Sequence, residues 1–170
     1  VVCAASMEPP FPFYIVRAQG REARIEKHAL RLPEGAAAHD GHIHSHFGYC
    51  AEDVRPASAI ERARMLGLSG ITCVEHAGQI YLTREEFWGT AHIEDPGILR
   101  RARAEGRDRM AAFRREMAAY RSDFVRLGLE VEADRTGGLT LLPEDADGWD
   151  TLLGGIHWLP RDMPAATQKQ

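Results

Sequence analysis

The densest group of reactive side chains in this sequence is a run of histidines that follows an acidic residue. The run reads Asp40-Gly-His42-Ile-His44-Ser-His46. Alternate side chains of a strand share one face, so a strand that ends here would point His42 and His44 the same way. Two imidazoles on one face can chelate a single metal ion. The alternative is a polar loop that happens to be rich in histidine.

Three later segments place histidine or glutamate within or directly after an apolar run. Each has an ordinary structural explanation: a surface loop for Glu75-His76, a salt bridge to an arginine for Glu130, and a core histidine for His157. The segments are Ile71-Thr-Cys-Val-Glu75-His76, Leu129-Glu130-Val131-Glu132 and Gly154-Gly-Ile-His157-Trp158.

Taken together, these segments favour a metal site over several unrelated explanations. Glu130 lies inside an apolar strand pattern, and a buried carboxylate needs a partner because an unpaired buried charge is costly or shifts its pKa. Ligand types would follow four successive strands, and in α/β folds the active site lies beyond the carboxyl ends of the strands. The pattern indicates a multi-metal hydrolytic site of carboxylates and imidazoles.

The elements that must position these side chains alternate between strand and helix. Because this alternation has short connections, we expect an α/β fold with a parallel sheet or barrel. The expected order is a strand at 37–43, a helix at 56–66, a strand at 69–74 and, after a polar loop, a long helical stretch, a strand at 129–131, a turn at 136–138, a short helix at 145–152 and a strand at 154–158.

The long helical stretch carries one apolar stripe. We expect it to start with Asp95 as the cap and Pro96 at the first helical position, and to end before Gly128. Gly106 is a point at which it can divide into two helices. The stripe recurs at steps of three and four and consists of Met110, Phe113, Met117, Tyr120, Phe124 and Leu127.

Length and composition limit the fold and the function. A chain of 170 residues with 44% apolar and 27% charged residues is typical of one globular domain. A net charge of −4 does not favour nucleic-acid binding, and no apolar run approaches the roughly 20 residues of a membrane helix. Three cysteines predict no disulfide framework, so a reducing, cytoplasmic setting is expected.

The first 35 residues form a separate part of the predicted organisation. Residues 14–18 and 22–26 flank Gln19-Gly20-Arg21, which predicts a β-hairpin with glycine at the turn. Residues 32–35 then form a linker. We therefore expect an N-terminal extension at 1–35 and an α/β domain at 36–170. That domain holds about four strand–helix units, whereas a closed barrel takes seven or eight units and roughly 250 residues.

The motifs and their order resemble the polymerase and histidinol phosphatase (PHP) family, in particular its histidinol-phosphatase-like branch. The resemblance covers about residues 38–160. It is carried by Asp40-Gly-His42-Ile-His44-Ser, Glu61-Arg-Ala63 with Leu66-Gly67, Ile71-Thr-Cys-Val-Glu75-His76-Ala77, Leu82-Thr-Arg-Glu-Glu-Phe87, Leu127-Gly-Leu-Glu130-Val-Glu132 and Gly154-Gly-Ile-His157-Trp158.

This resemblance implies a distorted (β/α)7 barrel, similar to a TIM barrel, that holds up to three zinc, manganese or iron ions. By the resemblance, His42 and His44 bind the first metal and Glu130 bridges it to the second. His157 binds the second metal and His76 binds the third. His42, His44, Glu130 and His157 are also the expected catalytic residues.

The chain departs from the family pattern at two places. Cys50 stands where the family carries a further ligand of the third metal, normally His or Asp; a thiolate is a good zinc ligand, and His46 is a possible substitute. The family also has another His ligand and an Asp-x-His motif near its end, which do not follow His157 here. We therefore expect a partial barrel that lacks its C-terminal part. A second copy of the chain in a homo-oligomer, or a completing C-terminal segment, would supply the missing part.

The implied function is that of a metal-dependent phosphoesterase, a hydrolase that cleaves a small phosphate ester with a metal-activated water. The alternative is a catalytically inactive or truncated PHP module with a metal-binding or structural role. A metal-dependent nuclease or an amidohydrolase-type barrel ranks lower. The basic candidates for the phosphate are Arg84, Arg100, Arg101 and Arg103, each of which is otherwise a solvated surface residue.

Overall fold

The computed structural model describes residues 11–19, 22–30 and 35–157. Strands β1 (Phe11–Gln19) and β2 (Glu22–Leu30) pair antiparallel, from Phe11 opposite Leu30 to Gln19 opposite Glu22. This confirms the hairpin predicted at 14–18 and 22–26 and extends both strands. The glycine of the turn and residues 32–34 of the predicted linker lie outside the described residues.

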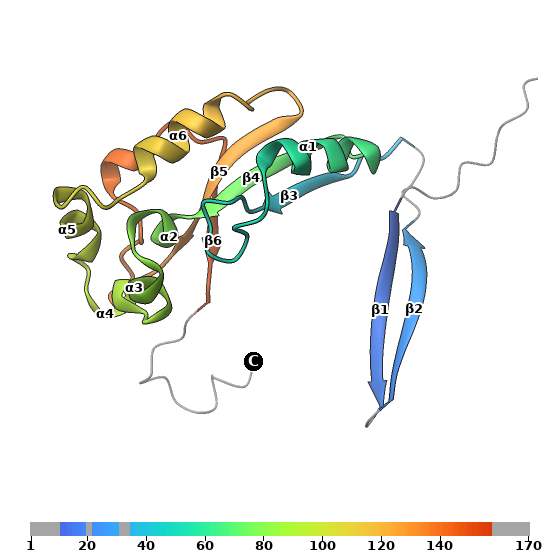
Figure 1. Ribbon diagram of the computed structural model, residues 1–170, viewed down its shortest axis with the longest axis horizontal. Coiled ribbons are helices and arrows are strands. Elements are labelled where there is room, and N and C mark those ends of the chain that lie inside the picture. Colours follow the sequence, from blue (N-terminus) through green and yellow to red (C-terminus); the bar gives the residue numbers. More distant parts are fainter. Residues whose placement is uncertain (1–10, 20–21, 31–34, 158–170) are drawn as a thin grey trace, which may run out of the picture.

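A second, parallel sheet carries the candidate ligands His42, His76 and Glu130, and His44 and His157 follow two of its strands. It consists of β3 (His39–Ile43), β4 (Gly70–His76), β5 (Val125–Glu132) and β6 (Thr151–Gly155), side by side in that order. Spatial order follows chain order, whereas a doubly wound fold reverses direction at one point of its sheet. The sheet is curled and resembles half a barrel (Figure 1). The α/β prediction is confirmed at this level.

The helices lie in the connections between these strands. Helix α1 (Pro56–Met65) joins β3 to β4, with proline in its first turn, and the chain then reverses at Gly67, whose φ of 73° suits glycine. A longer connection joins β4 to β5. It contains α2 (Ala77–Tyr81), α3 (Arg84–Trp88), α4 (Ala91–Glu94), α5 (Ile98–Ala104) and α6 (Met110–Ala118).

The hydrophobic core lies between the helices and one face of the sheet. In β5 it takes the alternate residues Val125, Leu127, Leu129 and Val131, which pack with buried side chains of the helices. The intervening positions of the strand, including Glu130 and Glu132, belong to the opposite face because strand side chains alternate. Along β5, an apolar face is thus separated from a face that carries Glu130 and Glu132.

Three of the predicted helical features are wrong. Helix α5 begins at Ile98 with Gly97 as its cap, because Asp95 instead binds the Gly97 amide and Arg101. Helix α6 ends at Ala118 and Leu127 lies on β5, since the alternation of residues 125–131 outweighs the helical spacing. The helix expected at 145–152 is absent from this part of the described chain, where a single 3-10 turn (Pro143–Asp145) precedes β6.

Other segments lie where the sequence predicted them or form elements that the sequence did not predict. Helix α1, strands β3 and β4 and the turn near Gly137 lie where they were expected. The polar loop expected after β4 instead forms α2, α3 and α4, and the capping box of Thr83 and Glu86 begins α3. None of the helices in the described ranges is long and apolar enough to cross a membrane.

Candidate metal centre

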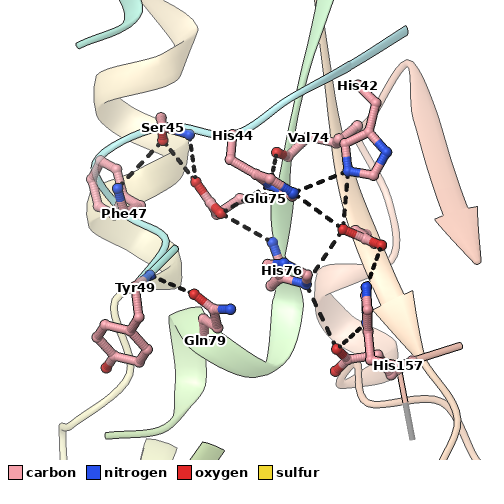
Figure 2. A network of polar contacts seen from close by, with 12 residues as sticks. His42, His44, Ser45, Phe47, Tyr49, Val74, Glu75, His76, Gln79 and His157 are labelled. Atoms are coloured by element: carbon pink, nitrogen blue, oxygen red, sulfur yellow. Dashed lines mark hydrogen bonds and ion pairs between the residues drawn. The ribbon is translucent and has the colours of Figure 1, made fainter. Parts of the chain in front are cut away.

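Histidine and glutamate side chains from all four strands of the parallel sheet converge at one edge. This follows from the parallel topology, which brings the carboxyl ends of the strands together. Figure 2 shows the imidazoles of His42, His44, His76 and His157 around shared carboxylates. By origin, the ligand types are His42 on β3, His44 just after it, His76 at the end of β4, Glu130 and Glu132 on β5, and His157 two residues after β6.

Three atoms form the tightest group. His42 Nε2 lies 3.0 Å from His44 Nε2 and 3.1 Å from Glu130 Oε2, and His44 Nε2 lies 3.5 Å from the same oxygen. Ligand atoms bonded to one ion at about 2.0–2.2 Å lie roughly 3.3–3.6 Å apart at the tetrahedral angle and roughly 2.8–3.1 Å apart at 90°. The three donors therefore have the mutual spacing of ligands around one ion.

The environment of His44 directs its free nitrogen toward this group. His44 Nδ1 donates to the carbonyl oxygen of Val74 at 3.0 Å, because a carbonyl can only accept. In the neutral ring, Nε2 is then unprotonated and available to a metal. Burial lowers the pKa of His44, but Glu75, Glu130 and the Val74 carbonyl raise it by more, so the pKa lies above its ordinary value.

Glu75 supports the loop after β3. Its fully buried carboxylate accepts hydrogen bonds from the Ser45 amide at 2.9 Å and the Ser45 hydroxyl at 2.8 Å. Gly48 leaves room for it, since a Cβ there would lie 2.3 Å from Glu75 Oε1. The sequence pointed to the Glu75-His76 pair but not to this anchoring contact.

A second group consists of His76, Glu132 and His157, whose ligand atoms lie within 4.8 Å of one another. Glu132 Oε1 lies 2.9 Å from His157 Nδ1 and 3.6 Å from His76 Nδ1. Burial raises the pKa of Glu132, but the nearby imidazoles of His76, His92 and His157 have the larger effect and lower the pKa to about 2. Glu132 was not among the predicted ligands, although its spacing of two from Glu130 puts both on one face.

A third group contains the cysteine. Donor atoms of His44, Cys50 and His76 lie within 4.8 Å of one another. Burial, with a further contribution from Glu75, raises the pKa of the Cys50 thiol, so a metal would have to displace its proton. His46 does not take this place, because its Nε2 pairs with Glu116 at 3.3 Å.

The predicted phosphate-binding arginines are all engaged elsewhere. Each pairs with a carboxylate, and no hydrogen bond or ion pair in the described structure joins any of them to the histidine and glutamate cluster. The pairs are Arg84 with Glu52, Arg100 with Glu144, Arg101 with Asp95, and Arg103 with Asp108 and Asp145.

The charge balance of the centre also favours a cation. The carboxylates of Glu75, Glu130 and Glu132 are all buried. Within the described ranges, no Lys or Arg pairs with any of them, and their charged partners are histidines. Buried charges without compensation are unfavourable, and imidazole and carboxylate donors suit zinc, iron and manganese.

Comparisons with protein-family models, with curated protein sequences and with solved structures returned no significant match to this chain. The centre is thus defined by its geometry. Its donor set fits a divalent metal ion, and all six residues predicted as ligands contribute to one of the three groups: His42, His44, Cys50, His76, Glu130 and His157. Their individual roles stay predictions.

Proposed function

We propose that this chain is a metal-dependent phosphoesterase related to the PHP phosphatases, with a small phosphate ester as its substrate. The observation that carries the proposal is the spacing of His42 Nε2, His44 Nε2 and Glu130 Oε2, which lie 3.0–3.5 Å apart. The order of the sequence motifs and the parallel strands with ligands at their ends agree with a partial (β/α)7 barrel.

The chemistry of such a site follows from its donors. A divalent ion held there would act as a Lewis acid toward phosphate oxygens and lower the pKa of a bound water toward neutrality. The protein holds two imidazoles and a carboxylate in fixed positions, and it fixes the His44 tautomer through the Val74 carbonyl. Glu130 lies between the His42 and His157 rings and can bridge two ions.

Formal charge gives a reason for more than one ion. Glu75, Glu130 and Glu132 bring three buried negative charges, and the neutral histidines bring none. One divalent ion leaves the centre at 2 − 3 = −1, which repels an anionic ester, whereas two ions bring it to 4 − 3 = +1. We therefore expect two or three zinc, manganese or iron ions in the working site.

The test combines metal content with turnover. Protein purified without added metal is measured by plasma mass spectrometry and assayed with p-nitrophenyl phosphate and with histidinol phosphate. We expect two or more ions per chain and a hydrolysis rate that His42→Ala reduces by at least about a hundredfold, since the loss of a ligand to the reacting centre removes several kcal/mol of transition-state stabilisation.

His46→Ala is the matched control. His46 belongs to the same histidine run but pairs with Glu116 outside the centre, so this variant should keep both metal and turnover. Bound metal without turnover of any phosphate ester would reject the phosphoesterase and leave the alternative, a metal-binding module without catalysis. Equal losses in both variants would show that the effect is not specific to the centre.

A further inference from the structure

Glu132 is the buried last residue of β5 and belongs to a different donor group from His42. Its backbone is fixed by Thr140, whose amide donates to the Glu132 carbonyl at 2.8 Å and whose hydroxyl accepts from the Glu132 amide at 3.0 Å. Glu132 as a whole residue is 2% exposed, so its carboxylate is buried. The fixed backbone and the burial of the side chain restrict the orientation of the carboxylate.

The oxygen Oε1 of Glu132 faces two histidine nitrogens, and one of them lacks a hydrogen bond. His76 Nδ1 is buried, lies 3.6 Å from Glu132 Oε1 and 3.3 Å from Glu130 Oε2, and has no hydrogen-bond partner among the described residues. A buried nitrogen without a partner that faces two carboxylates is typical of a ligand atom. A small cavity of about 50 Å³ is lined in part by Glu132 and His157.

The oxygen Oε2 of Glu132 faces a third histidine, which the sequence did not single out. His92, on α4, is 2% exposed, and its Nε2 lies 3.4 Å from Glu132 Oε2. The His92 ring stacks on Phe87 with 4.9 Å between ring centres and 3° between planes. Phe87 also contacts the ring of His76. The packing therefore fixes the plane of His92 behind the carboxylate.

We propose that Glu132, His76 and His157 hold a metal ion at a position distinct from the His42–His44–Glu130 group, and that His92 is a positioning residue that fixes the Glu132 carboxylate. The proposal rests on the proposed function in placing metal at this centre, but it does not require turnover. The His42 group accounts for one ion, and the second ion expected from the charge balance then has three ligands of its own.

An ion pair alone would satisfy fewer of these atoms. Glu132 Oε1 can accept from His157 Nδ1, but this leaves His76 Nδ1 without a partner in the described structure. A metal ion uses the lone pairs of His76 and His157 together with one carboxylate oxygen, and the other oxygen stays with His92. Histidines or carboxylates behind a ligand commonly orient it in this way.

The test counts metal ions by titration. Metal-free protein is titrated with Co²⁺, whose visible absorption reports ligand number and geometry, and the number of ions is checked by plasma mass spectrometry. We expect Glu132→Gln to lose one ion per chain and to keep the absorption of the His42 group. His42→Ala should lose the other ion, and the double variant should lose both.

Glu116→Gln is the matched control, because Glu116 also pairs with a histidine but lies outside the centre. It should bind Co²⁺ as the wild-type protein does. If Glu132→Gln retains all its ions with unchanged affinity and spectrum, the second metal position is wrong. That result is distinguishable from a failure of the proposed function, which would appear as absent turnover with the metal count intact.

Two substitutions at His92 separate positioning from packing. His92→Phe keeps a ring against Phe87 but removes the nitrogen near Glu132, whereas His92→Gln can still donate toward Glu132. We expect Co²⁺ affinity at the Glu132 position to fall roughly tenfold to a hundredfold in His92→Phe and to recover in His92→Gln. Thermal unfolding of the metal-free variants checks that both fold. Equal affinities in folded His92→Phe and wild-type protein would overturn the role of His92.

Discussion

At the scale of single residues, the centre is organised by carboxylates that each face several imidazoles. Glu130 Oε2 lies within 3.5 Å of nitrogens of His42, His44 and His76, and Glu130 Oε1 lies 3.3 Å from His157. A carboxylate has about four lone-pair sites, so it can serve several partners at once. A metal ion bound by these donors would displace any proton that lies between a carboxylate and an imidazole.

This competition gives Glu132 a measurable effect on stability in acid. Its pKa is about 2 in the folded protein, against an ordinary value of 4.5. A depressed carboxyl pKa contributes stability above the unfolded value, and this contribution is lost as the pH falls from 4.5 toward 2. The full contribution is on the order of 3 kcal/mol.

We expect the unfolding free energies of metal-free wild-type protein and Glu132→Gln to differ by this amount near pH 6 and to converge toward pH 2. Urea unfolding at several pH values, followed by circular dichroism, measures the difference. Because other carboxyls titrate in both proteins, only the difference between the two is informative. A difference that stays constant with pH would contradict the depressed pKa.

The sequence indicated part of this residue-level arrangement and missed another part. His42, His44, His76, Glu130 and His157 were predicted because ligand types follow strands, and parallel strands end at one edge. His92 could not be found in this way. It lies on a four-residue helix inside a segment that reads as a polar loop, and only the packing of Phe87 brings it to Glu132.

At the scale of elements, the ends of the strands are shaped to admit the ligands. Gly155 is the last residue of β6, and a Cβ there would lie 2.6 Å from Glu130 Oε1 and 2.9 Å from His157 Cε1. Real Cβ atoms do not approach so closely, so a side chain at this position would push the carboxylate or the imidazole away. The absence of a side chain is thus a requirement of the site rather than of the backbone.

The expected result is that Gly155→Ala weakens metal binding by roughly tenfold or more, as displaced ligand-orienting groups do. Gly154→Ala is the matched control on the same strand, since a Cβ there meets nothing within 4 Å. Zinc affinity measured with a competing chelator compares the two. If both substitutions leave the affinity unchanged, the centre does not depend on the close approach at Gly155.

The elements themselves were predicted unevenly, for physical reasons. Strands β4 and β5 coincide with apolar runs that are buried in the fold, and such runs are strong signals. Helices α2, α3 and α4 have four or five residues each, too few for a helical period to be visible. The stripe of α6 was extended too far because Leu127 continues its spacing by coincidence, although Leu127 belongs to the alternation of β5.

At the scale of the whole molecule, the curled sheet leaves two outer edges. In the described structure, β3 has β4 as its only partner in this sheet and β6 has β5. Unpaired edges of a sheet are sites where further strands can add. The closed (β/α)7 barrel remains a prediction from the resemblance, because four strands and their order agree with part of a barrel but do not specify its closure.

The charge of the whole centre leads to the last prediction. With one divalent ion the formal charge is 2 − 3 = −1, and with two it is 4 − 3 = +1, given the buried carboxylates of Glu75, Glu130 and Glu132. The attraction of a phosphate to this centre should therefore change sign between the first and the second equivalent of metal. We expect inorganic phosphate to bind weakly or not at all after one equivalent of zinc and measurably after two.

Isothermal titration with phosphate at zero, one and two equivalents of zinc tests this, with sulfate as a second anion of similar shape. The affinity for phosphate should fall as the salt concentration rises. The decrease should be smaller than for a surface site, because buried charges are screened less. Phosphate binding of equal strength at one and two equivalents would contradict the formal charge counted from Glu75, Glu130 and Glu132, and the number of metal ions required for function would then have to be reconsidered.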